Sequence, residues 1–201
     1  MKNIIKQTTL MIAICVIGLT GTLYAQSVYK LTDSKDINMK LSGTSTLHNW
    51  TMNAQTFSGE AQFAVKEHQI GSLKALTFSM AVTDLKSGES GLDKNAYKAL
   101  KSNDFKSISY KLTSATVLPG KGNKFEIKTV GNLTIAGVTK EVIVYVYATL
   151  NASETITCTG SEKLNMTDYG VKPPKFMLGA MKTGDAITLD FTLVYRKQTG
   201  I

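Results

Sequence analysis

From Ile37 onward, the chain alternates apolar and polar side chains with a period of two residues. Residues 76–83 form a clear run, with apolar positions at Leu76, Phe78, Met80 and Val82. Residues 108–112 and 187–193 repeat the pattern. Because successive residues of a β-strand point to opposite faces, each run predicts a strand with one buried face and one face in water. Such strands are typical of antiparallel sheets.

Residues 141–150, with the sequence EVIVYVYATL, are apolar on both faces. A strand of this kind is covered on both sides or carries an apolar outer surface. Glycines interrupt several of the strand-like runs, as they do at the bends and bulges of a curving sheet. The pattern therefore predicts an all-β, closed or nearly closed structure with a helix laid against it.

Two segments have apolar residues at helical spacing. Residues 92–102 place Leu92, Ala96, Ala99 and Leu100 on one face and predict a short helix. Residues 174–181 follow Pro173 and repeat apolar side chains less regularly. They predict a second short helix or an ordered lip.

The first 25 residues have the features of a secretory signal peptide. A short basic start precedes an apolar run, and Ala25 offers a small residue for cleavage. An uncleaved anchor is the alternative. We expect residues 1–25 to be removed and residues 26–201 to form one domain, in which Cys158 is the only cysteine. Such a protein is exported, to the periplasm or outside the cell, and its mature chain has no intramolecular disulfide.

The formal net charge of the whole chain is +8. This balance favours anionic surfaces or head groups as partners, so an anionic membrane surface is one candidate partner. The lysines are scattered and form no basic block, which argues against a nucleic-acid-binding protein. The oligomeric state is left open.

Motifs for catalysis are weak. His48 and His68 are the only histidines, and neither belongs to a recognisable metal motif, so we expect no metal and no cofactor. Cys158 lies in an alternating segment without a nucleophile elbow, which favours a buried structural thiol. We therefore expect a protein that is not an enzyme. A lipid-directed hydrolase or isomerase that uses His48 with Asp84 or Asp168 is an alternative.

Four segments, in this order, carry a resemblance to a known family. They are ALKSNDFKSISYKLTSATV, GNLTIAGVTKEVIVYVYATL, LNMTDYGVKPPKFMLG and GDAITLDFTLVYRK. Over residues 28–197 the chain closely resembles the YceI-like family of exported lipid- and polyisoprenoid-binding proteins. The resemblance implies a single extended antiparallel β-barrel of about eight strands, lipocalin-like in shape, with an apolar tunnel for an isoprenoid chain. The chain has STLHNW in an early segment, where better-known members carry a His-Ser pair.

The resemblance implies a protein that binds or transports an isoprenoid or similar amphiphilic lipid in the cell envelope. A structural or interaction module of the envelope without a small ligand is an alternative. Lys172, Lys175 and Lys182 flank the apolar segment at 176–181 and are candidates for an anionic head group. The predicted ligand-binding residues are His48, Trp50, Leu76, Phe78, Met80, Ile108, Tyr110, Leu133, Phe176, Met177, Leu189 and Phe191.

His48 and Trp50 pose a question of orientation. If they lie in a strand, they point to one face and Leu47 points to the other. When that face is the interior, Trp50 lines the tunnel. When it is the exterior, Trp50 packs beneath the helix at 92–102 and Leu47 points inward.

Overall fold

Eight antiparallel strands close into a barrel, because β12 pairs both with β10 and with β1. The computed structural model describes residues 26–32, 37–176 and 181–198. The barrel order is β1 (Gln26–Leu31), β4 (Ser58–Lys66), β5 (Gln69–Ala81), β7 (Ser107–Pro119), β8 (Lys124–Ile135), β9 (Val138–Leu150), β10 (Thr155–Asn165) and β12 (Met181–Lys197). The predicted all-β barrel of about eight strands is confirmed.

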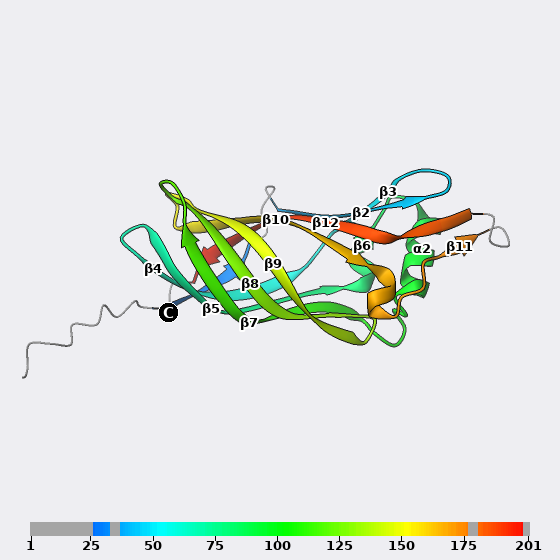
Figure 1. Cartoon of the computed structure of the whole chain (residues 1–201), viewed down its shortest axis with the longest axis horizontal. Helices are drawn as coiled ribbons and strands as arrows, with labels where there is room; N and C mark the ends of the chain where they lie inside the picture. Colours follow the sequence, from blue (N-terminus) through cyan, green and yellow to red (C-terminus); the bar gives the residue numbers. More distant parts are fainter. Residues whose placement is uncertain (1–25, 33–36, 177–180, 199–201) are drawn as a thin grey trace, which may run out of the picture.

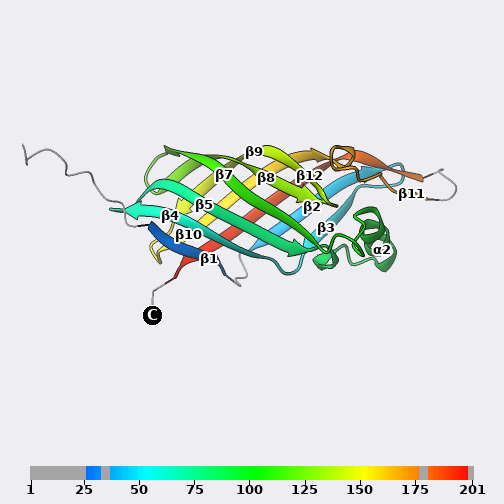
Figure 2. The same ribbon diagram turned by 90° about the horizontal axis from the view of Figure 1, so that it is seen from below.

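Three more strands extend the barrel at one end. The C-terminal part of β12 pairs with β1, whereas its earlier part, from Thr183 to Thr192, pairs with β2 (Asn38–Ser45). β3 (Trp50–Ala54) then pairs with β2, and β6 (Leu85–Lys86) pairs with β3. The result is an elongated barrel whose β2–β3 hairpin lies at the opposite end from the β4–β5 hairpin (Figure 1). Figure 2 shows the tilt of the strands along this long axis.

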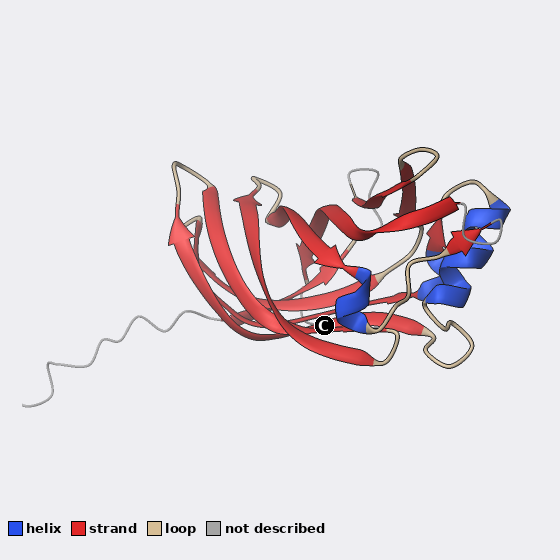
Figure 3. Ribbon diagram, turned by 45° about the vertical axis from the view of Figure 1, so that its right-hand side comes forward, coloured by secondary structure: helices blue, strands red, loops and turns tan. Residues whose placement is uncertain are grey.

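The helical segments lie toward the end that carries the β2–β3 hairpin (Figure 3). They are η1 (Val82–Asp84), α2 (Ser90–Ala99) and η2 (Met166–Tyr169). The helix predicted at 92–102 is confirmed but begins at Ser90 and ends at Ala99. It is held in place by Tyr97, whose hydroxyl donates to the carbonyl oxygens of Thr83 and Leu85.

Of the two predictions for residues 174–181, a second short helix or an ordered lip, the described residues contradict the helix. The helix expected there is wrong for Lys175, Phe176 and Met181, because Lys175 and Phe176 form the short strand β11 (Lys175–Phe176), which pairs with Lys182 and Met181. Residues 177–180 lie outside the described residues. Pro174 fixes its own φ angle and restricts Pro173 before it to extended conformations, and β12 offers a free edge, so the chain pairs as a strand.

The two faces of β9 have different surroundings. Val142, Val144 and Val146 line the interior. On the outer face, Ile143, Tyr145 and Tyr147 are 47%, 48% and 59% exposed. The strand therefore carries an apolar outer surface, which was one of the two interpretations of its sequence.

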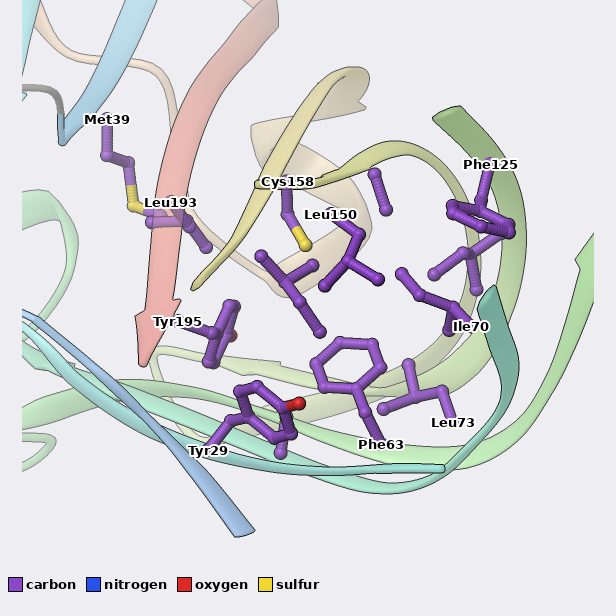
Figure 4. Packing of buried hydrophobic residues seen from close by; sticks show 14 of the residues in the cluster. Tyr29, Met39, Phe63, Ile70, Leu73, Phe125, Leu150, Cys158, Leu193 and Tyr195 are labelled. Atoms are coloured by element: carbon purple, nitrogen blue, oxygen red, sulfur yellow. The ribbon is translucent and has the colours of Figure 1, made fainter. Parts of the chain in front are cut away.

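A packed core fills the end of the barrel opposite α2. Phe63 is fully buried there and makes edge contacts with Tyr29 and Tyr195, at centroid distances of 5.4 and 6.1 Å. Figure 4 shows these rings packed with Ile70, Leu73, Phe125 and Leu150, which come from strand ends near the hairpin turns. We call this end of the barrel the closed end, and the end that carries α2 and the β2–β3 hairpin the open end.

Within residues 26–32, 37–176 and 181–198, the structure has no helix that is long and apolar enough to cross a membrane. The signal peptide predicted at residues 1–25 lies outside the described residues.

Candidate functional site

A cavity of about 410 Å³ occupies the interior of the barrel between its open end and the packed core. Its volume is in the range of small-molecule sites. It reaches exposed residues at the open end, where His48, Asn165 and Lys182 line it. Its floor includes Phe63, Leu73 and Tyr195, the inner face of the closed end. Residues of β12 between Met181 and Tyr195 line the wall of the cavity. This part of the strand is about 45 Å long at 3.3 Å per residue.

Most of the wall is apolar because each strand contributes its inward-facing series. The apolar face of α2 adds Leu92, Ala96 and Ala99. Ten of the twelve predicted ligand-binding residues line the cavity: His48, Trp50, Leu76, Phe78, Met80, Ile108, Tyr110, Leu133, Leu189 and Phe191. The side chain of Phe176 and all of Met177 lie outside the described residues. That these residues contact a ligand remains a prediction.

The segment around His48 is a loop and not a strand. Ser45 closes the β2–β3 turn: its Oγ accepts hydrogen bonds from the backbone N–H groups of Leu47 and His48 and donates one to the His48 carbonyl oxygen. Strand β3 begins only at Trp50. The two-residue alternation therefore does not apply, and Leu47, His48 and Trp50 all line the cavity. The interior position expected for His48 and Trp50 agrees with the structure, whereas the expectation that Leu47 points to the other side is wrong.

Three aromatic side chains of the wall lie over glycines of neighbouring strands. Trp50 lies over Gly43, Phe191 over Gly160 and Tyr110 over Gly131, so close in each case that a Cβ atom on the glycine would overlap the ring. Gly43 and Gly160 are the direct cross-strand partners of Trp50 and Phe191. Because glycine has no side chain, the rings can lie against the wall, and the centre of the barrel stays open.

Few polar groups face the cavity beyond its open end. The hydroxyl groups of Tyr110 and Tyr195 are buried and make no hydrogen bond in the described part of the chain. Burial raises the pKa of both. Burial also raises the pKa of the Cys158 thiol to about 12, so this thiol stays protonated at neutral pH. Cys158 is thus the buried structural cysteine that its sequence context favoured.

Glu162 is the one cavity-lining residue with a carboxyl group among those described. Its side chain is half-buried, and burial raises the pKa of the carboxyl group. Sequence reasoning missed Glu162. The alternation of Cys158, Gly160, Glu162 and Leu164 along one strand was the signal that could have found it.

Lysines gather at the open end. Lys182 lines the cavity, and Lys175 is its direct cross-strand partner. Lys172 is exposed nearby in sequence. Like charges directly opposite each other repel, so this pair favours an anion between or beside them. None of the ion pairs found among the described residues involves these lysines.

The acidic partners that an enzyme built on His48 would need are engaged elsewhere. Asp84 accepts a hydrogen bond from the Thr56 hydroxyl, and Asp168 accepts one from the Asn165 side chain at 3.3 Å. In the described residues, neither carboxylate bonds to His48. Residues 26–32, 37–176 and 181–198 also contain no cluster of three or more histidine, cysteine, aspartate or glutamate side chains suited to a metal ion.

Comparison with protein families gives a match to the YceI-like domain. The match covers residues 29–195, which is most of the chain and extends from within β1 to within β12. A search of curated proteins finds no match.

Solved structures with the same fold come from several bacteria. A polyisoprenoid-binding domain from Saccharophagus degradans, implicated in plant cell wall breakdown, superposes with a TM-score of 0.64 at 10% identity and covers 87% of this chain and 100% of its own. BcnA from Burkholderia cenocepacia gives a TM-score of 0.61 at 18% identity, covering 78% and 95%. The YceI protein of Campylobacter jejuni gives 0.57 at 15% identity, covering 74% and 85%. At these identities the likeness concerns the fold.

Proposed function

Because the chain belongs to the YceI-like domain family, we propose that it binds an isoprenoid or a similar long-chain lipid inside its barrel, without catalysis. The observation that carries this proposal is the cavity, which runs from exposed residues at the open end to the aromatic floor formed by Phe63 and Tyr195. The polyisoprenoid-binding domain among the solved structures supports the same class of ligand.

Burial of the tail supplies the affinity. Each CH₂ group removed from water contributes about 0.8 kcal/mol, so one isoprene unit contributes roughly 3 kcal/mol. Association and ordering cost about 4–15 kcal/mol. A ligand with a handful of units still reaches a micromolar Kd, which corresponds to about −8 kcal/mol. Affinity should therefore rise with tail length until the cavity is full.

The head group of the ligand stays at the open end. The lining there includes the side chains of Asn95, Asn165 and Lys182, whereas the floor is apolar apart from the Tyr195 hydroxyl. Lys175 stands opposite Lys182 and adds a second positive charge. A phosphate or other anionic head group can pair with these lysines while its tail fills the barrel.

The proposed location is the cell envelope or the outside of the cell. The features of residues 1–25 support export by a cleavable signal peptide. Positive charge at the open end supports an approach to anionic membranes, from which a lipid could be taken or to which it could be delivered. The buried, protonated thiol of Cys158 and the absence of an acidic partner for His48 in the described residues support a role without catalysis.

A second candidate function is an interaction module of the envelope. The exposed Ile143, Tyr145 and Tyr147 on the outer face of β9 favour it, because tyrosines are common in interfaces. This role would use the outside of the barrel and would leave the cavity unexplained.

Trp50 provides the test of lipid binding, because it is the only tryptophan of the chain and lines the cavity. Titration with geranylgeraniol should change its fluorescence with a micromolar Kd, and a ten-carbon isoprenoid alcohol should bind more weakly. A response that does not saturate, or that is independent of tail length, would count against the proposal. A reproducible protein partner together with no lipid response would favour the interaction module.

A further inference from the structure

Glu162 places a carboxyl group inside the apolar cavity. It lies on β10 in the same inward-facing series as Cys158 and Leu164. Its backbone stands opposite Leu189 of β12, which also lines the cavity. A lipid tail that fills this part of the barrel must therefore pass beside a carboxyl group.

The carboxyl group of Glu162 takes part in none of the ion pairs or side-chain hydrogen bonds found among residues 26–32, 37–176 and 181–198, whereas its backbone pairs with β12. In the empty barrel, water can solvate the carboxylate, since its side chain is only half-buried. An entering tail would displace that water. Burying an ionised carboxylate is strongly unfavourable unless a partner pairs with it. The ligand itself is the group that can supply this partner.

The depth of Glu162 in the barrel determines which part of the ligand it contacts. It lies three residues before Asn165, the last residue of β10 at the open end, which is about 10 Å of strand inside. Lys182 and Lys175 lie further out, because Lys182 precedes Leu189, the cross-strand partner of Glu162, by seven residues of β12, which is about 23 Å of strand. An anionic head group is attracted by the lysines and repelled by the carboxylate, so it stays outside. Glu162 then faces the tail about 23 Å of strand inside the lysines, and it faces the head of a ligand whose uncharged head group is not held by them.

We propose that Glu162 selects among lipids by accepting a hydrogen bond from an O–H or N–H group that the ligand carries at the depth of Glu162, which is the start of the tail in a lipid with an uncharged head group. This inference rests on the proposed function and specifies its ligand class. Long-chain alcohols, amides and amines share this donor. Hydrocarbons, ethers and esters lack it, and they leave the carboxylate without a partner.

Matched probes that differ only in the donor test this proposal. Geranylgeraniol, its methyl ether and geranylgeranylamine have the same tail, and Trp50 fluorescence reports their binding to the intact protein. We expect the alcohol to bind about tenfold more tightly than the ether, equivalent to about 1.4 kcal/mol. The amine shows whether an ammonium group serves as well as a hydroxyl group.

Two variants of Glu162 and one control variant test whether Glu162 causes the preference for the alcohol over the ether. Glu162→Leu should reduce the alcohol-to-ether preference to about one, and Glu162→Gln should keep part of it because an amide oxygen still accepts a hydrogen bond. Glu126 lies on the outer face of β8, where its partner Tyr147 is exposed, so Glu126→Gln should keep the full preference.

Equal affinity of the wild-type protein for alcohol and ether would overturn this inference while leaving the proposed function intact. A preference that persists in Glu162→Leu would also overturn it. If none of the probes binds the wild-type protein, the proposed function fails and this inference fails with it.

Discussion

The indole ring of Trp50 lies over Gly43, its cross-strand partner on β2, and its Nε1–H donates a hydrogen bond of 3.1 Å to the carbonyl oxygen of Thr44. The glycine provides the space, and the hydrogen bond fixes the orientation of the ring. Trp50 therefore lines the cavity from the wall and does not block it. Phe191 over Gly160 and Tyr110 over Gly131 repeat this arrangement deeper in the barrel.

We predict that Gly43→Ala destabilises the protein by about 1–3 kcal/mol, because the added methyl group overlaps the Trp50 ring. The ring should move, and its fluorescence emission should shift. Gly91→Ala is the matched control, because Gly91 lies in α2 with nothing within 4 Å of its added Cβ. This control should be neutral or stabilising by up to about 1 kcal/mol. Chemical unfolding measures both, and equal effects would contradict the packing described for Trp50.

Gly160→Val should weaken lipid binding by about tenfold or more, because the new side chain pushes the Phe191 ring into the cavity. Phe191→Leu in the same chain should restore much of the affinity, since the smaller side chain needs less room. Titration by Trp50 fluorescence measures both variants. Unchanged binding by Gly160→Val, or no recovery in the double variant, would show that this pair does not keep the cavity open.

The Cys158 thiol should be almost inert in the folded protein, because burial raises its pKa to about 12 and keeps it protonated. Cys15→Ser leaves Cys158 as the only thiol of the chain. In this variant, Ellman's reagent at pH 8 should react at least about 100-fold more slowly with folded than with urea-unfolded protein. Similar rates in the two states would mean that the thiol is accessible and reopen the case for a nucleophile.

Glu162 should make stability depend on pH. Burial raises the pKa of its carboxyl group in the folded protein, so the folded state binds more protons than the unfolded chain between the two pKa values. Stability then falls as the pH rises through this window. Tyr169 of η2 is a titratable neighbour, and the charge of Glu162 contributes to the raised pKa of Tyr169.

The Glu162→Gln variant has no carboxyl group to ionise at this position, so it should not lose stability as the pH rises. Its Tm should therefore exceed that of the wild type at pH 7. The difference should vanish below about pH 4, where the carboxyl group is protonated in both states. Thermal unfolding from pH 3 to pH 8 measures it, with Glu126→Gln as the control. A Tm difference that is the same at every pH would contradict the assignment to the Glu162 carboxyl group.

The walls of the barrel could be predicted from the sequence because alternation fixes which side chains point inward once the strands are known. The inward positions of Leu76, Phe78 and Leu189, for example, follow from the two-residue period alone. The same alternation places Glu162 on the inner face, although a charged residue is ordinarily expected on the face in contact with water.

The structure differs from the sequence predictions at the ends of strands. At Leu47 and His48, the turn closed by Ser45 replaces the strand that alternation assumed. At Lys175 and Phe176, pairing with β12 decides the conformation, and such a contact between distant segments has no local signal. The contacts of Trp50 and Phe191 with glycines on neighbouring strands likewise depend on register, which the sequence does not state.

Native mass spectrometry of the protein, purified without detergent from cells that naturally produce it, can detect whether the barrel holds a long-chain lipid. We predict a bound species that organic solvent releases and that carries a long apolar tail with an O–H or N–H donor near its head. Lipid-free protein that also fails to take up geranylgeraniol at micromolar concentration would contradict it.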